Sequence, residues 1–253
     1  MPYTTFSDAQ ITRLIQTINQ QGYAVLPDWA SSEQLEQLKT LVVSAVAAAG
    51  NDYVALTGSE AVAGTPLQDW GTSRAFIDLC RRIVVGATGQ EARDPGLQQT
   101  LRCLTGNGGR RESLIFHYDS FVLTTIMPVC MPDEGESGDL LMLPSRRPLR
   151  RHYALNLLDK LLVDNRWMQR RLAKRYATQA ETFTRIRMLP GNLYLFWGYR
   201  SLHTNLPVAQ DALRATAVFH YHNVHGSSSL ANRIRRSVNR LKPVSVPVDA
   251  TQS

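Results

Sequence analysis

Two side chains that can bind a metal, His117 and Asp119, stand two residues apart in the stretch SLIFHYDSF. The residues around them favour β-structure, and in a strand residues i and i+2 point to the same face. The spacing therefore allows an imidazole and a carboxylate to bind one ion from one side. Short H-x-D matches also occur by chance, so this pair alone does not identify a site.

A third candidate ligand, His203, follows His117 by 86 residues in the stretch PGNLYLFWGYRSLHTNLPV. A Pro-Gly turn opens an apolar strand there, which runs into a polar loop that carries the histidine. Arg214 stands 11 residues further on and begins the run RATAVFHYHN. Two imidazoles and one carboxylate that leave coordination positions open are the ligand set of non-haem Fe(II) oxygenases. An arginine that points toward the same site can bind a carboxylate through its two-pronged guanidinium.

At these residues the chain resembles the Fe(II)/2-oxoglutarate-dependent dioxygenases, in particular their phytanoyl-CoA dioxygenase-like branch. The stretch QQGYAVLPDWASSEQLEQLK is similar to the family's helix-strand-helix opening, and LPGNLYLFWGYRSLHTNLPV to its PGD…F…H…N strand. The resemblance covers roughly residues 8–224. It implies a double-stranded β-helix, also called a jelly roll, with His117, Asp119 and His203 as catalytic iron ligands.

The resemblance also implies the cofactors, which are Fe(II), 2-oxoglutarate as co-substrate, and O2. Arg214 matches the arginine that binds the far carboxylate of 2-oxoglutarate in the family. Thr216 stands where relatives often have a Ser or Thr that helps to hold that carboxylate. Halogenating relatives have Gly or Ala at the position of Asp119, so the carboxylate implies oxidation of a C–H bond, by hydroxylation or a related reaction.

Two departures from the family pattern concern the substrate. Many relatives have a PGSH-like stretch after the first ligand strand, where this chain has LPSRRPLRRH. The helical insertion at about residues 155–177 is also unusually long. These departures leave the expected iron ligands intact and leave the substrate open. From the breadth of the family we expect a small-molecule substrate, with biosynthetic tailoring as the expected role.

Strand alternation extends the candidate site beyond Arg214. If Arg214 and Thr216 point into a barrel, His220 and His222 do so as well. These two histidines are therefore candidates for the substrate pocket. Hydrogen bonds to structural groups near the barrel end would explain them equally well.

Positive charge is concentrated in two segments of a chain whose net charge is +7. SRRPLRRH includes Arg146 and Arg147, and ANRIRRSVNRLK lies near the C-terminus. The first segment could recognise an anionic substrate, or one tethered to CoA or a carrier protein; a solvated basic surface is the alternative. The aromatic-basic interleaving of RNA-binding proteins and zinc-finger spacing do not accompany these segments, so nucleic acid is not the expected partner.

Helices and strands that position these residues can be predicted from periodicity and turn residues. Residues 7–22, 31–50 and 72–89 predict helices, the first two with capping residues at their starts, and residues 23–27 predict a short strand. Residues 51–70 lack clear periodicity and predict a loop. Short β-rich runs separated by turns then predict strands at 113–129, 138–145, 182–190, 192–198 and 213–223.

The predicted fold class is α+β with a mainly β core, in the form of a jelly roll with N-terminal helices. We expect one domain, with a helical part at about 1–100, a β core at about 101–225 and a basic tail at about 229–253. An apolar span of about 18 residues is absent. The stretch MPYTTFSDAQITRLIQ does not predict a secretory signal, and the three cysteines form no CxxC pair. We therefore expect a cytoplasmic protein without a membrane partner; the oligomeric state is not predicted.

Two alternative functions stay open at the level of sequence. A demethylase or hydroxylase with the same chemistry, acting on nucleic acid or protein, is suggested only by the positive charge. A non-catalytic cupin-like binding protein could keep the barrel without the reaction. The complete set of His117, Asp119, His203 and Arg214 argues against this second alternative.

Overall fold

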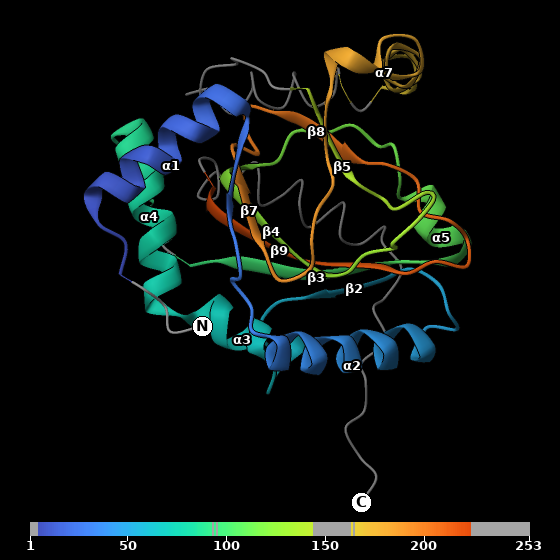
Figure 1. The fold of residues 1–253 in the computed structure, drawn as a ribbon, viewed down its shortest axis with the longest axis horizontal. Coiled ribbons are helices and arrows are strands. Elements are labelled where there is room, and N and C mark those ends of the chain that lie inside the picture. The colour runs from blue at the N-terminus through green and yellow to red at the C-terminus, as the bar shows by residue number, and fades with distance from the viewer. Residues whose placement is uncertain (1–4, 93, 95, 144–162, 164, 224–253) are drawn as a thin grey trace, which may run out of the picture.

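Two antiparallel β-sheets form the centre of the computed structural model, which describes residues 5–92, 94, 96–143, 163 and 165–223 (Figure 1). The larger sheet has the strand order β1-β7-β4-β9-β3-β2, and the smaller sheet the order β6-β5-β8. In sheet order, the strands of the larger sheet are β1 (Tyr23–Leu26), β7 (Leu193–Phe196), β4 (Phe121–Cys130), β9 (Arg214–Asn223), β3 (Gln98–Leu104) and β2 (Val54–Thr57). Those of the smaller sheet are β6 (Thr184–Ile186), β5 (Leu140–Leu143) and β8 (Leu202–Asn205).

Helices from the N-terminal part of the chain cover one face of the larger sheet, and α7 lies beyond the smaller sheet (Figure 1). The helices are α1 (Asp8–Gln21), α2 (Ser32–Ala48), α3 (Pro66–Thr72), α4 (Arg74–Thr88), α5 (Gly106–Arg111) and α7 (Arg166–Thr178), with short 3-10 helices at Glu60–Val62 and Ala180–Thr182. Capping boxes start α1 and α2: Ser7 pairs with Gln10, and Ser31 with Gln34. These reciprocal bonds satisfy backbone donors that a helix start leaves free.

Strand alternation divides the buried side chains into layers. On β9, Phe219 belongs to the cluster packed under the helices, where it contacts Phe76 of α4. A second apolar cluster joins the two sheets and includes Ile126 of β4 and Met142 of β5. The third lies on the outer side of the smaller sheet, where Leu172 of α7 packs. This antiparallel β core with helices outside it confirms the predicted α+β class.

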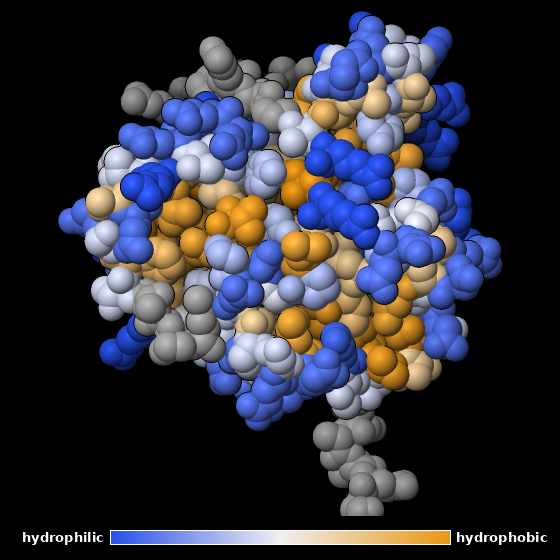
Figure 2. All heavy atoms as spheres, viewed as in Figure 1, coloured by the Kyte–Doolittle hydropathy of each residue, from blue (hydrophilic) through white to orange (hydrophobic). Residues whose placement is uncertain are grey.

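The smaller sheet is covered on its outer side by α7. The helix has the sequence RWMQRRLAKRYAT, in which Leu172 is buried. The surface over α7 is largely hydrophilic (Figure 2), as expected for a helix that buries a narrow stripe. Helix α7 agrees with the later part of the predicted insertion, whereas residues 155–162 lie outside the described residues.

Long-range pairing overrides the local pattern in several places. Residues 51–70, predicted as a loop, contain β2, a 3-10 helix and the first part of α3. Strand β2 is stabilised by its pairing with β3. Neither β3 nor β8, which pairs with β5, was predicted from the sequence. Residues 113–120, predicted as strand, lie before β4 and form only an isolated bridge at His117. β-structure depends on distant partners, so a local sequence pattern is a weak guide to it.

None of the described helices is both long and apolar enough to cross a lipid bilayer. The predicted basic tail at about 229–253 lies outside the described residues, as do the pocket candidates Arg146 and Arg147.

Phe76 of α4 packs between the helical layer and the larger sheet. It is fully buried, with ring centroids 5.0 Å from Trp29 and 5.2 Å from Phe219. We predict that Phe76→Ala lowers the free energy of unfolding by about 3–5 kcal/mol, because it leaves a cavity between helix and sheet. Chemical denaturation measures this. Val43→Ala, at a helix position 60% exposed, is the control; an equal loss in both variants would contradict the prediction.

Candidate metal centre

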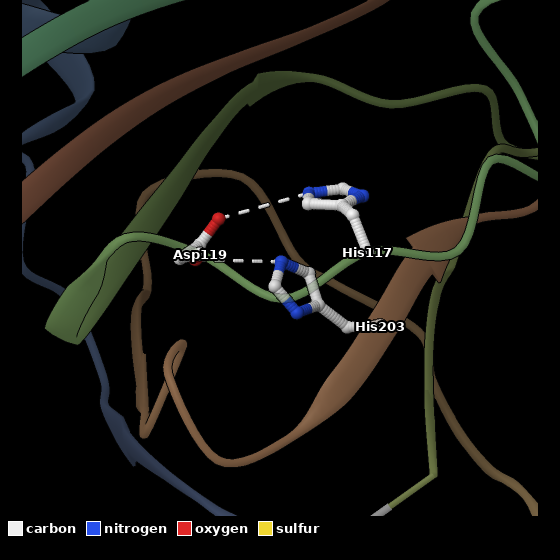
Figure 3. A group of neighbouring side chains, drawn as sticks. All are labelled: His117, Asp119 and His203. Atoms are coloured by element: carbon white, nitrogen blue, oxygen red, sulfur yellow. Dashed lines mark ion pairs between the residues drawn. The ribbon is translucent and has the colours of Figure 1, made fainter. Parts of the chain in front are cut away.

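Three side chains, His117, Asp119 and His203, point toward one another (Figure 3). One ligand atom from each lies within 4.8 Å of the others. Nε2 of His117 is 3.7 Å from Oδ1 of Asp119, and Nε2 of His203 is 3.4 Å from Oδ2. A single metal ion can therefore contact all three side chains, and the structure brings together the three residues that the sequence selected.

Reciprocal backbone hydrogen bonds hold the two histidines side by side. The N–H of His117 donates to the carbonyl of His203 at 3.0 Å, and the N–H of His203 donates back at 3.1 Å. Directly paired residues of an antiparallel ladder project to the same face, and here the ring centroids are 4.4 Å apart. The proximity thus comes from this bridge, not from the regular H-x-D strand that the sequence suggested.

Asp119 is positioned by a different backbone contact. Its N–H donates to the carbonyl of Gly198, which follows β7, at 3.0 Å. A Cβ atom at Gly198 would overlap both the Asp119 carboxylate and the Thr124 hydroxyl. Glycine is needed at this position because the backbone approaches the carboxylate so closely.

Hydrogen bonds to carbonyl groups set the tautomer of both histidines. Nδ1 of His117 lies 2.9 Å from the carbonyl oxygen of Ile115, and Nδ1 of His203 lies 2.9 Å from that of Ser201. A carbonyl oxygen only accepts, so Nδ1 carries the proton in both rings and Nε2 keeps its lone pair. Both lone pairs therefore belong to the nitrogens nearest Asp119. Metal-binding histidines are oriented by the same kind of second contact.

The surroundings of His117 and Asp119 keep both side chains in the protonation states that metal binding requires. Desolvation by the surrounding protein atoms, and secondly repulsion from His203, lower the pKa of His117 to about 4. The side chain is nevertheless 40% exposed. Burial by itself raises the pKa of Asp119, but three nearby histidines and a hydrogen bond from Thr124 outweigh it and hold that pKa well below its usual range. Near neutral pH this imidazole is neutral and this carboxylate ionised, as metal ligands must be.

Arg214 is buried at the start of β9, with 3% of its surface exposed. Nη1 donates to the Thr216 hydroxyl at 3.3 Å, and Nε has no hydrogen-bond partner among the described residues. Burial and the neighbouring Arg102 lower the pKa of Arg214 to about 9, which Asp139 opposes.

The nearby carboxylate of Asp139 is already engaged. It accepts from Nε of Arg185 at 2.7 Å and from the Ser137 hydroxyl at 2.9 Å. In the described part of the chain, Arg214 forms no ion pair of its own. A buried guanidinium without an ion-pair partner can bind an anionic group.

The two pocket candidates on β9 have different environments. Nδ1 of His220 lies 3.9 Å from the Asp119 carboxylate and 3.1 Å from the Thr124 hydroxyl. His222 has a φ of 61°, which interrupts strand alternation before the strand ends. Burial lowers the pKa of His222, and the charged group that opposes this is Glu91, which follows α4. The structure therefore places His220, but not His222, beside Asp119.

Sequence reasoning missed two residues that contact Asp119. Thr124 is on β4 and donates a short hydrogen bond to Oδ2 of Asp119. Gly198 is in the stretch FWGYR between a strand and the His203 loop. A glycine directly after an apolar run was a visible signal of close backbone approach. The contact of Thr124, by contrast, depends on a register that only the folded sheet defines.

The inserted helix is joined to the residue that precedes His117. The side-chain amide of Gln169 in α7 accepts from the N–H of Phe116 at 2.9 Å and donates to its carbonyl oxygen at 2.7 Å. This is the hydrogen-bond pattern that a neighbouring strand would supply. Helix α7 is thus fixed next to the exposed edge of the candidate metal centre.

No protein-family model matches the chain, and no curated protein matches it in sequence. Solved structures nevertheless share its fold. A prolyl 4-hydroxylase structure from Phytophthora capsici is 12% identical with a TM-score of 0.54, covering 94% of this chain and 77% of the other. The epimerase SnoN, in complex with Fe3+, alpha ketoglutarate and nogalamycin RO, is 12% identical with a TM-score of 0.51, covering 86% and 85%. These likenesses confirm the predicted jelly-roll fold.

Close packing at Gly198 generates a test of the metal centre. Gly198→Ala should push the Asp119 carboxylate away from the two histidines, and we predict at least about a tenfold loss of Co(II) affinity. Anaerobic calorimetric titration measures it. The control is Gly86→Ala in α4, where the added Cβ would meet only the end of the Ile15 side chain. Unchanged affinity in a folded Gly198→Ala protein would contradict the prediction.

Proposed function

We propose that the chain is a non-haem Fe(II)/2-oxoglutarate-dependent dioxygenase that oxidises a C–H bond of a small molecule, by hydroxylation in the simplest case. Two imidazoles and one carboxylate, with Nε2 atoms oriented by carbonyl groups, carry this proposal. This donor set suits Fe(II) and leaves coordination positions open. When bound, Fe(II) with 2-oxoglutarate and O2 supplies the oxidising chemistry, in which the 2-oxo acid becomes succinate and CO2.

The role proposed for His117, Asp119 and His203 is to hold the metal from one side. Side-chain exposure falls from 40% at His117 to 10% at Asp119 and 6% at His203. The side of the site near His117 is therefore the accessible one. Substrate would approach there, next to Phe116 and the helix α7 that is tied to it.

The role proposed for Arg214 is to bind the distal carboxylate of 2-oxoglutarate, helped by Thr216. The support is the buried cation without a carboxylate partner in the described residues. An unpaired buried charge costs several kcal/mol, and a bidentate carboxylate would offset much of that cost. Gly138 leaves space for this side chain, since a Cβ there would overlap Cδ of Arg214.

The substrate class and the reaction type have separate supports. A phytanoyl-CoA dioxygenase-like assignment is supported by the sequence motifs alone. The Asp119 carboxylate supports oxidation over halogenation. No described feature favours the nucleic-acid or protein demethylase, and the donor set together with Arg214 disfavours a non-catalytic binding protein. Arg146 and Arg147, proposed for an anionic or carrier-bound substrate, lie outside the described residues.

Anaerobic binding of Fe(II) and 2-oxoglutarate tests the proposed function directly. Wild type should develop the weak visible charge-transfer absorption of an Fe(II) chelate with a 2-oxo acid. His117→Ala should abolish it by weakening metal binding. Arg214→Met should keep Fe(II) affinity but weaken 2-oxoglutarate binding about 10- to 100-fold, because a charge-assisted contact worth roughly 1.5–3 kcal/mol is lost. A wild-type protein that binds Fe(II) without this absorption would exclude the proposed function.

A matched glycine pair separates the co-substrate site from the metal site. Gly135 and Gly138 have φ angles of 69° and 70°, so alanine introduces similar backbone strain at both. At Gly138 the new Cβ would meet the side chains of Arg214 and Val208, whereas at Gly135 the space is open. We predict that Gly138→Ala raises the Kd of 2-oxoglutarate at least about tenfold, with Fe(II) affinity unchanged. Equal effects of Gly135→Ala and Gly138→Ala would show that strain, rather than Arg214, is responsible.

A further inference from the structure

A chain of hydrogen bonds leads from His220 through Thr124 to Asp119. The Thr124 hydroxyl donates to Oδ2 of Asp119, and Nδ1 of His220 lies 3.1 Å from the same hydroxyl oxygen. We propose that Thr124 and His220 are positioning residues that lock the Asp119 carboxylate so that Oδ1 alone is presented to the metal. This inference rests on the proposed function, because it assigns a role toward the proposed ion.

The number of hydrogens on each group fixes which atom donates in the hydrogen bonds that link His220, Thr124 and Asp119. A hydroxyl has one hydrogen, and an ionised carboxylate can only accept, so Thr124 donates to Asp119. Toward His220, the Thr124 oxygen must then be the acceptor. Nδ1 of His220 therefore carries a proton, and the three residues form one directed sequence of donors.

Packing and strand register hold His220 in place. Thr124 of β4 and His220 of β9 are direct partners in the antiparallel ladder, which puts their side chains on one face. The His220 ring also stacks on Phe121, with centroids 4.8 Å apart and planes 18° from parallel. The donor is thus held by the sheet rather than by the metal site itself.

The two oxygens of Asp119 have unequal surroundings. Oδ2 accepts from Thr124, faces the Gly198 backbone and lies 3.4 Å from Nε2 of His203, whereas Oδ1 accepts no hydrogen bond from the described residues and lies 3.7 Å from Nε2 of His117. Rotation of a carboxylate about χ2 is otherwise broad and two-fold. The Thr124 hydrogen bond selects one orientation, in which Oδ1 is the oxygen without a hydrogen bond from the described residues.

Single-oxygen ligation has a consequence for the reaction. If both oxygens of Asp119 bound the ion, the carboxylate would occupy a further coordination position. That position is needed for the co-substrates in a site built from three protein ligands. Thr124 and His220 therefore protect the open coordination positions, although neither side chain is itself a proposed metal ligand.

Two adjacent threonines provide a matched experiment. Thr124→Val removes the hydroxyl with little change of shape. Thr125→Val makes the same change one residue along β4, where the hydroxyl contacts only the Phe219 carbonyl at 3.4 Å among the contacts described. We expect Thr124→Val to weaken Co(II) binding about 10- to 100-fold and to alter the ligand-field absorption of bound Co(II). Thr125→Val should behave like wild type, and Thr124→Ser, which restores a hydroxyl, should recover both properties.

His220→Phe keeps an aromatic ring against Phe121 and removes the donor to Thr124. It should change the Co(II) absorption in the same direction as Thr124→Val but by less, since Thr124 still contacts Asp119. This variant also serves as the test if Thr124→Val does not fold. Wild-type affinity and absorption in folded Thr124→Val, or in His220→Phe when it alone folds, would overturn the positioning role. Failure of the wild type to bind Co(II) or Fe(II) would instead refute the proposed function.

Discussion

The candidate metal centre depends on one backbone contact, the reciprocal pair of hydrogen bonds between His117 and His203. It joins an irregular segment before β4 to a strand of the smaller sheet, and so brings together residues that are 86 positions apart. Because directly paired residues project to one face, this contact orients both rings at once. The carbonyl groups of Ile115 and Ser201 then only have to set the tautomers.

Two charged side chains, Asp119 and Arg214, are held in contrasting ways. Asp119 has hydrogen-bond partners for its backbone and its side chain: its N–H donates to the Gly198 carbonyl, and the Thr124 hydroxyl donates to its carboxylate. Arg214 has Thr216 but no described carboxylate partner, because Asp139 is already bound to Arg185. The Asp119 carboxylate therefore already accepts a hydrogen bond from the protein, whereas the Arg214 guanidinium has no described anionic partner. A glycine, Gly198 or Gly138, makes room beside each charge.

Much of the fold and of the site could be predicted because its determinants are local. Capping residues marked the starts of α1 and α2, since N-cap hydrogen bonds join residues three apart. The order and spacing of four residues in the sequence identified the side chains of the candidate metal centre, His117, Asp119 and His203, and the buried Arg214. Strands β2, β3 and β8 escaped prediction, because their partners lie far away in the chain and a short apolar run does not specify one.

The sequence by itself determined which chemical groups the site can contain: two imidazoles, a carboxylate and a guanidinium. It also determined the glycines that leave space beside them. Only the tertiary structure decided that His220 lies beside Asp119 while His222 does not, and that Thr124 contacts one carboxylate oxygen. It also decided that Arg214 is buried without a described carboxylate partner. The physical reason is that hydrogen-bond direction and charge pairing depend on register between distant strands. Periodicity along the chain predicts which residues share a face of a strand, but it does not predict which residues of distant strands pair.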